Sequence, residues 1–201
     1  MLKPEPDGKT GLPELAAIFH ALRRGRHISS ADGGIFTHLC NHFDAYCALL
    51  DELGFTLRRH PRDFFYLEDS SHFTEIAGKM ALFVFIMVEN IADRGLPVEE
   101  TLMTGSFAVD DLPHFSSDRY RSLMREADIA TPEQLSNVIS HLERHGFIRN
   151  KPDERFEFLT PAYRFLDLCM HYSSMALDND AGDVAEKAPS GMMQEMEVTD
   201  E

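Results

Sequence analysis

The chain has 201 residues, of which 43% are hydrophobic, enough for one large domain or two small ones with packed cores. Its net charge of -15 is the wrong sign for a protein that binds DNA tightly on its own, because phosphate binding requires Lys and Arg, although a local basic patch can exist on an acidic body. The longest unbroken apolar run, residues 80–88, is far shorter than the roughly 20 residues that span a bilayer. The polar start of the sequence also lacks a signal-peptide pattern, so we expect a soluble, cytoplasmic protein without membrane contact.

The first third of the chain has the pattern of two helices followed by a β-hairpin. Apolar residues at i, i+3, i+4 and i+7 predict a helix over residues 12–24. A longer apolar stripe predicts a single second helix over residues 35–53. Strand-forming runs at 55–57 and 64–67 then flank a polar turn that contains proline, which predicts a hairpin.

Residues 73–176 repeat this order with additional helices. The apolar run within residues 74–92 predicts a helix that is buried on all sides. Thr131, Pro132 and Gln134 form a capping-box pattern at the start of another helix. The remaining predicted elements are a short helix at 98–105, a helix at 116–129 with Ser117 as N-cap, the capped helix at 131–145, a hairpin at 147–159, and a last helix that starts at Pro161 with Thr160 as its cap.

The order helix, helix, hairpin therefore occurs twice. The simplest fold is mainly α-helical with small β-hairpin wings, arranged as two winged-helix domains in tandem. We place these domains at residues 12–72 and 73–176, after a flexible N-terminus at residues 1–11. Residues 177–201 hold eight acidic residues and one Lys, which leaves -8 for the rest of the chain. Because this segment lacks aromatic residues and periodicity, we predict a disordered acidic tail.

Several patterns that suggest chemistry are incomplete. His38 and His42 lie one helical turn apart, a spacing that can bind a metal, but Cys40 lies on the opposite side and the glutamate of an H-E-x-x-H motif is missing. The G-K-T at residues 8–10 lacks the rest of a phosphate-binding loop. The three cysteines have no paired spacing and are expected to be buried free thiols. We therefore expect no metal site, no cofactor and no enzymatic activity.

The candidates for DNA contact lie mainly on one helix and the hairpin after it. The exposed side of helix 133–145 is predicted to present the Arg, Asn and Gln side chains through which recognition helices contact bases. The residues on this side are Gln134, Asn137, Ser140, His141 and Arg144, with Glu143 beside them. The DNA-contact candidates are Arg144 on the helix, Arg149, Lys151 and Arg155 on the hairpin, and, as a second group, Arg23 and Arg26 at the end of the first helix.

Other interpretations of these cations are open. Solvated surface charge explains the first group equally well, and the helix dipole favours cations such as Arg23 at a helix C-terminus. Arg164 could add to a basic rim on the wing together with Arg149, Lys151 and Arg155, and Arg58, Arg59 and Arg62 on the first hairpin are similarly ambiguous.

Four segments of the chain resemble the MukE and MksE family, in the same order, over roughly residues 12–172. The family pattern A-L-R-x-G-R-H-I is matched at 21–28, and G-F-F-Y-L is matched at 63–67 except that Asp63 replaces the Gly. The region 93–118 looks shorter than in MukE, which favours the MksE branch. The later matches are Leu142, Gly146 and the apolar pair after it in "ISHLERHGFI", and Phe156, Thr160, Arg164 and Phe165 in "RFEFLTPAYRF".

The resemblance implies a non-enzymatic subunit of a bacterial SMC condensin complex. Family members dimerise and bind a kleisin, MukF or MksF, which closes the heads of an SMC ATPase, MukB or MksB, into a ring that entraps DNA. The complex compacts and segregates chromosomes, and the Mks type also acts against plasmids and can include a nuclease subunit. The implied location is cytoplasmic and nucleoid-associated, with weak, non-specific DNA contact. The resemblance assigns neither the kleisin-binding face nor the stoichiometry.

Two alternatives stay open at this point. A winged-helix transcription regulator predicts a basic recognition helix, and the polar face of residues 134–144 argues against it. The Wadjet-type anti-plasmid complex has a similar winged-helix subunit, which the sequence does not separate from MksE. A further hypothesis is that the acidic tail covers a basic strip, in which case deletion of residues 177–201 tightens non-specific DNA binding at low salt.

Overall fold

The structure is a computed structural model that describes residues 11–68 and 74–169. We call residues 11–68 the N-terminal half and residues 74–166 the C-terminal half; both lie in one compact unit that ends at Leu166. The predicted division at residue 72 and the acidic tail at 177–201 lie outside the described residues, as does nearly all of the N-terminal segment 1–11. These predictions therefore stay predictions.

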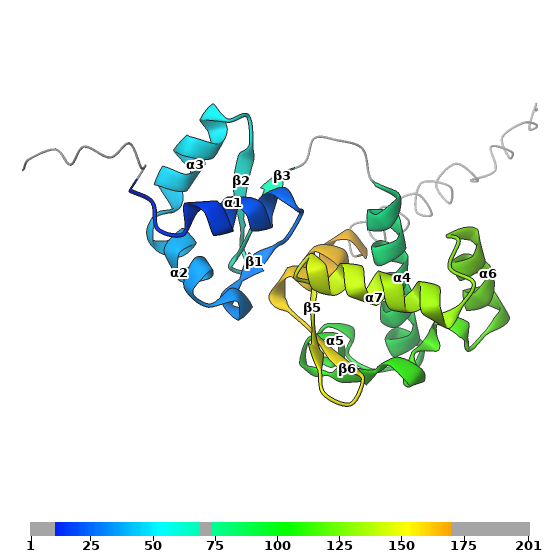
Figure 1. The fold of residues 1–201 in the computed structure, drawn as a ribbon. Helices are drawn as coiled ribbons and strands as arrows, with labels where there is room; N and C mark the ends of the chain where they lie inside the picture. Colours follow the sequence, from blue (N-terminus) through cyan, green and yellow to red (C-terminus); the bar gives the residue numbers. More distant parts are fainter. Residues whose placement is uncertain (1–10, 69–73, 170–201) are drawn as a thin grey trace, which may run out of the picture. The chain divides into compact units, whose positions relative to one another are not determined.

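The N-terminal half has three helices around a small antiparallel sheet (Figure 1). The strands lie in the order β1-β3-β2, and the β2–β3 hairpin confirms the predicted one. The sequence missed β1, which is only two residues long and pairs Ile28 with Phe65. In chain order the elements are α1 (Leu15–Arg23), β1 (Ile28–Ser29), η1 (Ser30–Asp32), α2 (Gly34–Asn41), α3 (Phe43–Glu52), β2 (Thr56–His60) and β3 (Phe64–Glu68).

The single helix predicted over residues 35–53 is wrong, because the chain bends at His42. His42 has φ -129° and ψ 27°, outside the helical region. Its N–H ends α2 by donating to the carbonyl of His38, and its own carbonyl accepts the N–H of Tyr46 at the start of α3. Leu39 before the bend and Tyr46 after it both enter the same core. The apolar stripe therefore continues through the bend and does not reveal it.

The C-terminal half repeats this topology behind an additional helix, α4. Its strands lie in the order β4-β6-β5, which matches the order in the N-terminal half. The mainly helical fold with small β-hairpin wings in tandem is thereby confirmed. In chain order the elements are α4 (Glu75–Asp93), α5 (Val98–Thr104), β4 (Ser106–Ala108), η2 (Val109–Asp111), η3 (Pro113–Phe115), α6 (Asp118–Glu126), α7 (Pro132–Arg144), β5 (Ile148–Lys151), β6 (Arg155–Phe158) and η4 (Thr160–Ala162), and residues 163–169 are helical.

Two of the three predicted helix caps are present. Thr131 accepts the N–H of Gln134, and the side chain of Gln134 accepts the N–H of Thr131 in return, which completes the capping box of α7. Ser117 caps α6 by accepting the N–H of Tyr120. Thr160 is not an N-cap, because it is the first residue of a 3-10 turn in which the N–H of Ala162 donates to the carbonyl of Leu159. The regular helix consequently begins two residues after the predicted Pro161.

Helix α4 is less buried than its composition predicts. It packs against α5, α7 and η3; α4 crosses behind α7 in Figure 1. The covered side carries Met80, Phe83, Val84, Ile86, Met87 and Ile91. Phe85, on the other side, is 39% exposed, so the prediction of a helix buried on all sides is wrong.

The two halves have separate hydrophobic cores of unequal size. Among the described residues, eight buried hydrophobic side chains form the N-terminal core, which centres on Ile18, Leu22 and Tyr46. Twenty-one form the C-terminal core, in which Phe83 of α4, Leu142 of α7 and Phe156 of β6 are fully buried. The side chain of Phe64 is fully buried but belongs to neither cluster.

Candidate functional site

Helix α7 occupies the place of the recognition helix in the C-terminal winged helix. Its apolar side, with Leu135, Val138, Ile139 and Leu142, is buried, and Gln134, Asn137, Ser140 and Arg144 are exposed as predicted. His141 departs from the prediction, because it is half-buried and its Nδ1 has no hydrogen-bond partner. Burial, and then the neighbouring charges of Arg144 and His145, lower the pKa of His141. The polar face of α7 is therefore narrower than the sequence predicts.

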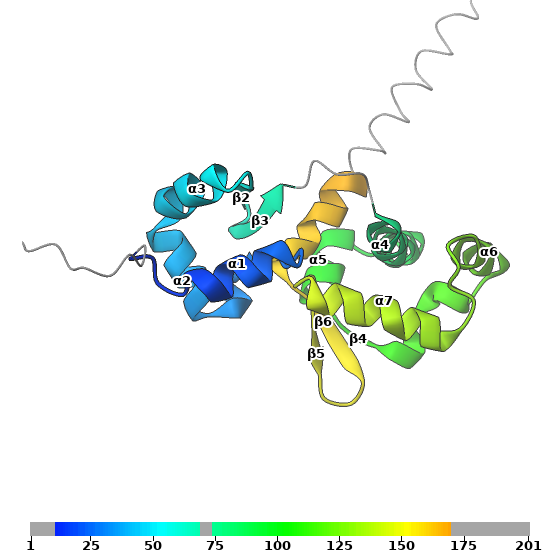
Figure 2. The same ribbon diagram turned by 45° about the horizontal axis from the view of Figure 1, so that its top comes forward.

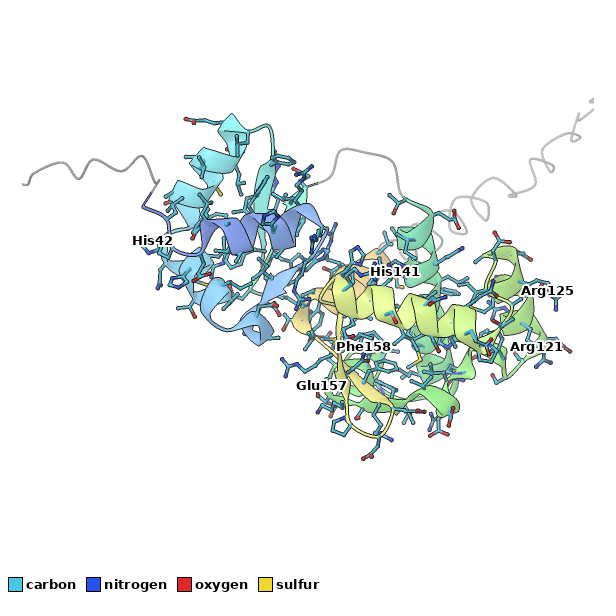
Figure 3. All side chains as sticks on the ribbon, viewed as in Figure 1. His42, Arg121, Arg125, His141, Glu157 and Phe158 are labelled. Carbon is cyan, nitrogen blue, oxygen red and sulfur yellow. The ribbon has the colours of Figure 1, made fainter. Side chains whose placement is uncertain are left out.

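Acidic groups engage most of the cations on the β5–β6 hairpin, which projects beyond α7 (Figure 2). Glu157, labelled in Figure 3, pairs with Arg149 at 3.7 Å and also with Lys151. Arg155 turns to the neighbouring strand β4, where it donates to the hydroxyl of Ser106 at 3.0 Å. Surface ion pairs of this kind are weak, so Arg149 and Lys151 can still contact a ligand, but Glu157 reduces the net positive charge of the hairpin.

The six DNA-contact candidates do not form one strip. Arg26, Arg144 and Arg149 line one hollow of about 450 Å³ together with Ser140 and Glu143. Arg155 lines a different hollow beside Ser106, and Arg23 and Lys151 line neither. Within the described part of the chain, the structure shows no hydrogen bond or ion pair for the guanidinium groups of Arg23 and Arg144.

Arg26 is already occupied inside the molecule. Its guanidinium pairs with Asp32 at 2.6 Å, and the Asp32 side chain is only 7% exposed. The same guanidinium donates to the backbone carbonyls of Glu143 and Arg144, each at 3.4 Å. These contacts assign Arg26 a structural role and leave Arg144 and Arg149 as the cations of the hollow with the most freedom.

Helix α3, the recognition helix of the N-terminal half, is acidic. Its charged residues are Asp44, Asp51 and Glu52, all exposed, and it contains no Lys or Arg. Burial, and then the charges of Asp51 and Asp44, raise the pKa of the Cys47 thiol on the same helix. This surface repels phosphate. The acidic composition of residues 43–52 in the sequence already indicates this surface.

The arginines of the β2–β3 hairpin all have acidic partners. Arg58 pairs with Glu68 at 2.6 Å and Arg59 with Asp63 at 2.6 Å. Arg62 reaches into the C-terminal half, where it pairs with Glu99 on α5 at 2.8 Å. All three arginines of the N-terminal wing are therefore ion-paired.

Residues from all four of the segments that carry the family resemblance meet at one place, which we call the junction. It consists of Arg26 and His27 after α1, Tyr66 on β3, His145 to Phe147 after α7, and Arg164. The imidazole of His27 lies 4.5 Å from the ring of Phe147 and 5.6 Å from that of Tyr66, measured between centroids. Phe64 packs beside it, with its ring centroid 6.0 Å from that of His27. The junction joins the two halves.

Other kinds of site are not found in the described residues. Within 11–68 and 74–169, no three His, Cys, Asp or Glu side chains lie close enough together to hold a metal ion. The thiols of Cys40, Cys47 and Cys169 are free and half-buried, less buried than predicted. None of the described helices has both the length and the apolar character needed to cross a membrane.

Comparison with protein-family models gives a match over most of the chain. The family model described as condensin complex protein MksE matches residues 13–170. No curated protein matches the chain. The matched range begins two residues before α1 and ends just after the last described residue, so it includes both winged helices and the junction.

Proposed function

Because this chain belongs to the MksE family of condensin complex proteins, we propose that it is a non-enzymatic subunit that binds the kleisin of a bacterial SMC complex. In this proposal the protein is a homodimer and reaches the SMC ATPase through the kleisin. It makes only a weak, non-specific contact with DNA. ATP hydrolysis belongs to the ATPase partner.

The charge of the two recognition helices is the observation that carries the proposal. Helix α3 has three acidic residues and no cation, and α7 has Glu133 and Glu143 against Arg144. A protein that binds DNA by itself releases counterions with Lys and Arg on such surfaces. A subunit whose main partner is a protein does not need them, because the ring of the complex holds the DNA.

The same observation limits the DNA contact that we propose. It falls on the C-terminal end of α7 and on the adjacent wing, with Arg144, Arg149 and Lys151 as the contact residues and Arg23 as an outlying cation. Arg155 and Arg26 help to shape the surface, and their guanidinium groups donate to other groups of the same chain. Phosphate contacts of this number give weak, salt-sensitive binding without sequence preference.

We place the complex in chromosome organisation and segregation or in defence against plasmids, with a nuclease as a further subunit in the second case. The corresponding location is the cytoplasm, at the nucleoid. A kleisin gene and a gene for a long coiled-coil ATPase beside this one would agree with either role.

A tagged pull-down from the native cells, with mass spectrometry and sizing of the complex, tests the proposal. We expect a kleisin and a large coiled-coil ATPase to be recovered, with this chain in at least two copies. A matched measurement on the purified chain should show DNA binding that is weak and lost as salt rises. Recovery of this protein alone, as a dimer that footprints one promoter, would instead establish a transcription regulator.

A further inference from the structure

The C-terminal end of α7 receives hydrogen bonds from its own following turn and also from the other half of the molecule. The last carbonyls of a helix have no partner within the helix and need donors from outside. The backbone N–H of His27 donates to the carbonyl of His145 at 2.8 Å, and Arg26 donates to the carbonyls of Glu143 and Arg144. A cation at this end of a helix is also favoured by the helix dipole. The segment after α1 therefore caps a helix that lies over a hundred residues later.

The ring of His27 makes a second link, and its partners determine its protonation. The guanidinium of Arg164 approaches Nε2 of His27 at 2.7 Å, and because arginine only donates, Nε2 must be the acceptor. The proton then resides on Nδ1, which lies 3.3 Å from the carbonyl of His145 and donates to it. Burial, and then the charge of Arg164, lower the pKa of His27 to about 3, so the ring is neutral near pH 7.

Arg164 also contacts the N-terminal sheet. Its guanidinium carbon lies 4.3 Å from the centre of the Tyr66 ring, a cation–π contact. Arg164 thus contacts His27 and Tyr66, two side chains of the N-terminal half, while its own backbone belongs to the C-terminal half.

A third link lies on the N-terminal wing. Arg62 pairs with Glu99 and lies over the ring of Tyr163, with 3.6 Å between the guanidinium carbon and the ring centroid. Hydrogen bonds from Arg62 and then from Tyr163 hold the pKa of Glu99 below its usual value. This contact comes from β2–β3 rather than from α1, so the two halves are tied by two separate elements of the N-terminal winged helix.

We propose that the junction is a lock that holds the two winged helices as one rigid body, with Arg164 as the residue that fastens His27 and Tyr66 to the C-terminal half. The lock fixes the position of α3 relative to α7, so a partner meets both recognition helices at a set spacing. The lock is a property of the chain alone, whichever partner the chain binds.

The test cuts the chain between the halves and asks whether they stay together. A site-specific protease sequence is inserted between Glu68 and Thr74 in the full chain, which is cleaved and then analysed by size exclusion and by titration of the fragments. The variants are Arg164→Ala and, as a matched control, Arg125→Ala. Arg125 is an exposed arginine on α6, away from the junction (Figure 3).

We expect the cleaved wild-type and Arg125→Ala proteins to elute as one species. In Arg164→Ala the association of the fragments should be about ten- to a hundred-fold weaker, because a hydrogen bond from a charged group and a cation–π contact are both lost. Separation of the wild-type fragments at once, or equal affinity in Arg164→Ala and wild type, would overturn the lock.

Hydrogen exchange in the uncleaved chain separates opening of the lock from unfolding. In Arg164→Ala the amide of His27, which donates across the junction, should lose protection while the amides of α4 keep theirs. Loss of protection in α4 as well would mean that Arg164 supports the fold of the C-terminal half rather than the lock.

Discussion

The two halves share a topology and differ in almost everything built on it. Each half has a three-stranded sheet whose last strand lies in the centre. In each half the hairpin of this sheet follows a recognition helix that ends in the same glycine-containing turn. The N-terminal core has eight buried hydrophobic side chains and the C-terminal core twenty-one. A domain of about 60 residues is marginally stable by itself. The comparison indicates that the larger half supplies the stability and the smaller one supplies a charged surface held in place by the junction.

The clearest difference lies at the glycines that end α3 and α7. Gly54 and Gly146 have the same left-handed φ of 80°, and each donates its N–H three residues back in the same turn. A Cβ on Gly54 would meet nothing within 4 Å, whereas a Cβ on Gly146 would lie 2.5 Å from the carbonyl oxygen of His27. One helix ends in open space and the other ends against the neighbouring half.

The largest expected effect follows from this pair. Gly54→Ala should cost about 1 kcal/mol of unfolding free energy, which is the strain of a left-handed alanine. Gly146→Ala adds a backbone collision to the same strain and should cost roughly 3 kcal/mol or more. Urea unfolding of both variants measures the difference. Equal costs would show that the backbone of His27 does not press on α7 in solution.

Acid should destabilise the protein through two buried histidines, His27 in the junction and His114 in the C-terminal half. Burial lowers the pKa of His27 to about 3 and that of His114, which stacks on Phe83, to about 4. An unfolded histidine has a pKa near 6.5, so between these values the unfolded chain binds more protons than the folded one. Stability should therefore fall as the pH drops below about 6.5, by up to roughly 1.4 kcal/mol per unit for each histidine.

Urea midpoints at several pH values between 7.5 and 4.5 measure this slope. His114→Gln should lower stability at every pH but flatten the slope, because one of the two groups no longer titrates. An unchanged slope would mean that His114 is not a source of the acid sensitivity.

The smallest expected effect compares the two wings in DNA binding. Glu157→Gln removes the acidic partner of Arg149 and Lys151 and should strengthen non-specific binding by about two- to five-fold at low salt. Glu68→Gln frees Arg58 on the N-terminal wing in the same way and should change little, because the acidic α3 lies in the same half. Fluorescence anisotropy with a short duplex measures both. Equal gains from the two variants would move the DNA contact away from the C-terminal wing.

Local signals predicted the parts of the fold that are built locally. The capping box of α7 rests on Thr131, Pro132 and Gln134, which are neighbours in the chain, and both hairpins follow from alternating runs and their turns. The strands β1 and β4 were missed because two or three residues carry no period. The break at His42 was missed because the residues on both sides of it face one core.

The candidate site was harder to predict, since its contacts join distant parts of the chain. Arg164 and His27 are 137 positions apart, and nothing near either residue indicates the other. Arg26 followed a cationic pattern that suggested DNA, and only the structure shows its guanidinium between Asp32 and the end of α7. Exposed cations are therefore easy to identify in a sequence, while their acidic partners across a fold are not.

The acidic face of α3 has a consequence for the pool of subunits outside any complex. At physiological ionic strength, where charge acts over about 8 Å, a helix with three carboxylates and no cation repels the sugar-phosphate backbone at close approach. Unassembled copies should then diffuse freely past the chromosome instead of coating it. Under the proposed function, the subunit then resides on DNA mainly when it is assembled, and its distribution in the cell follows the abundance of its partners.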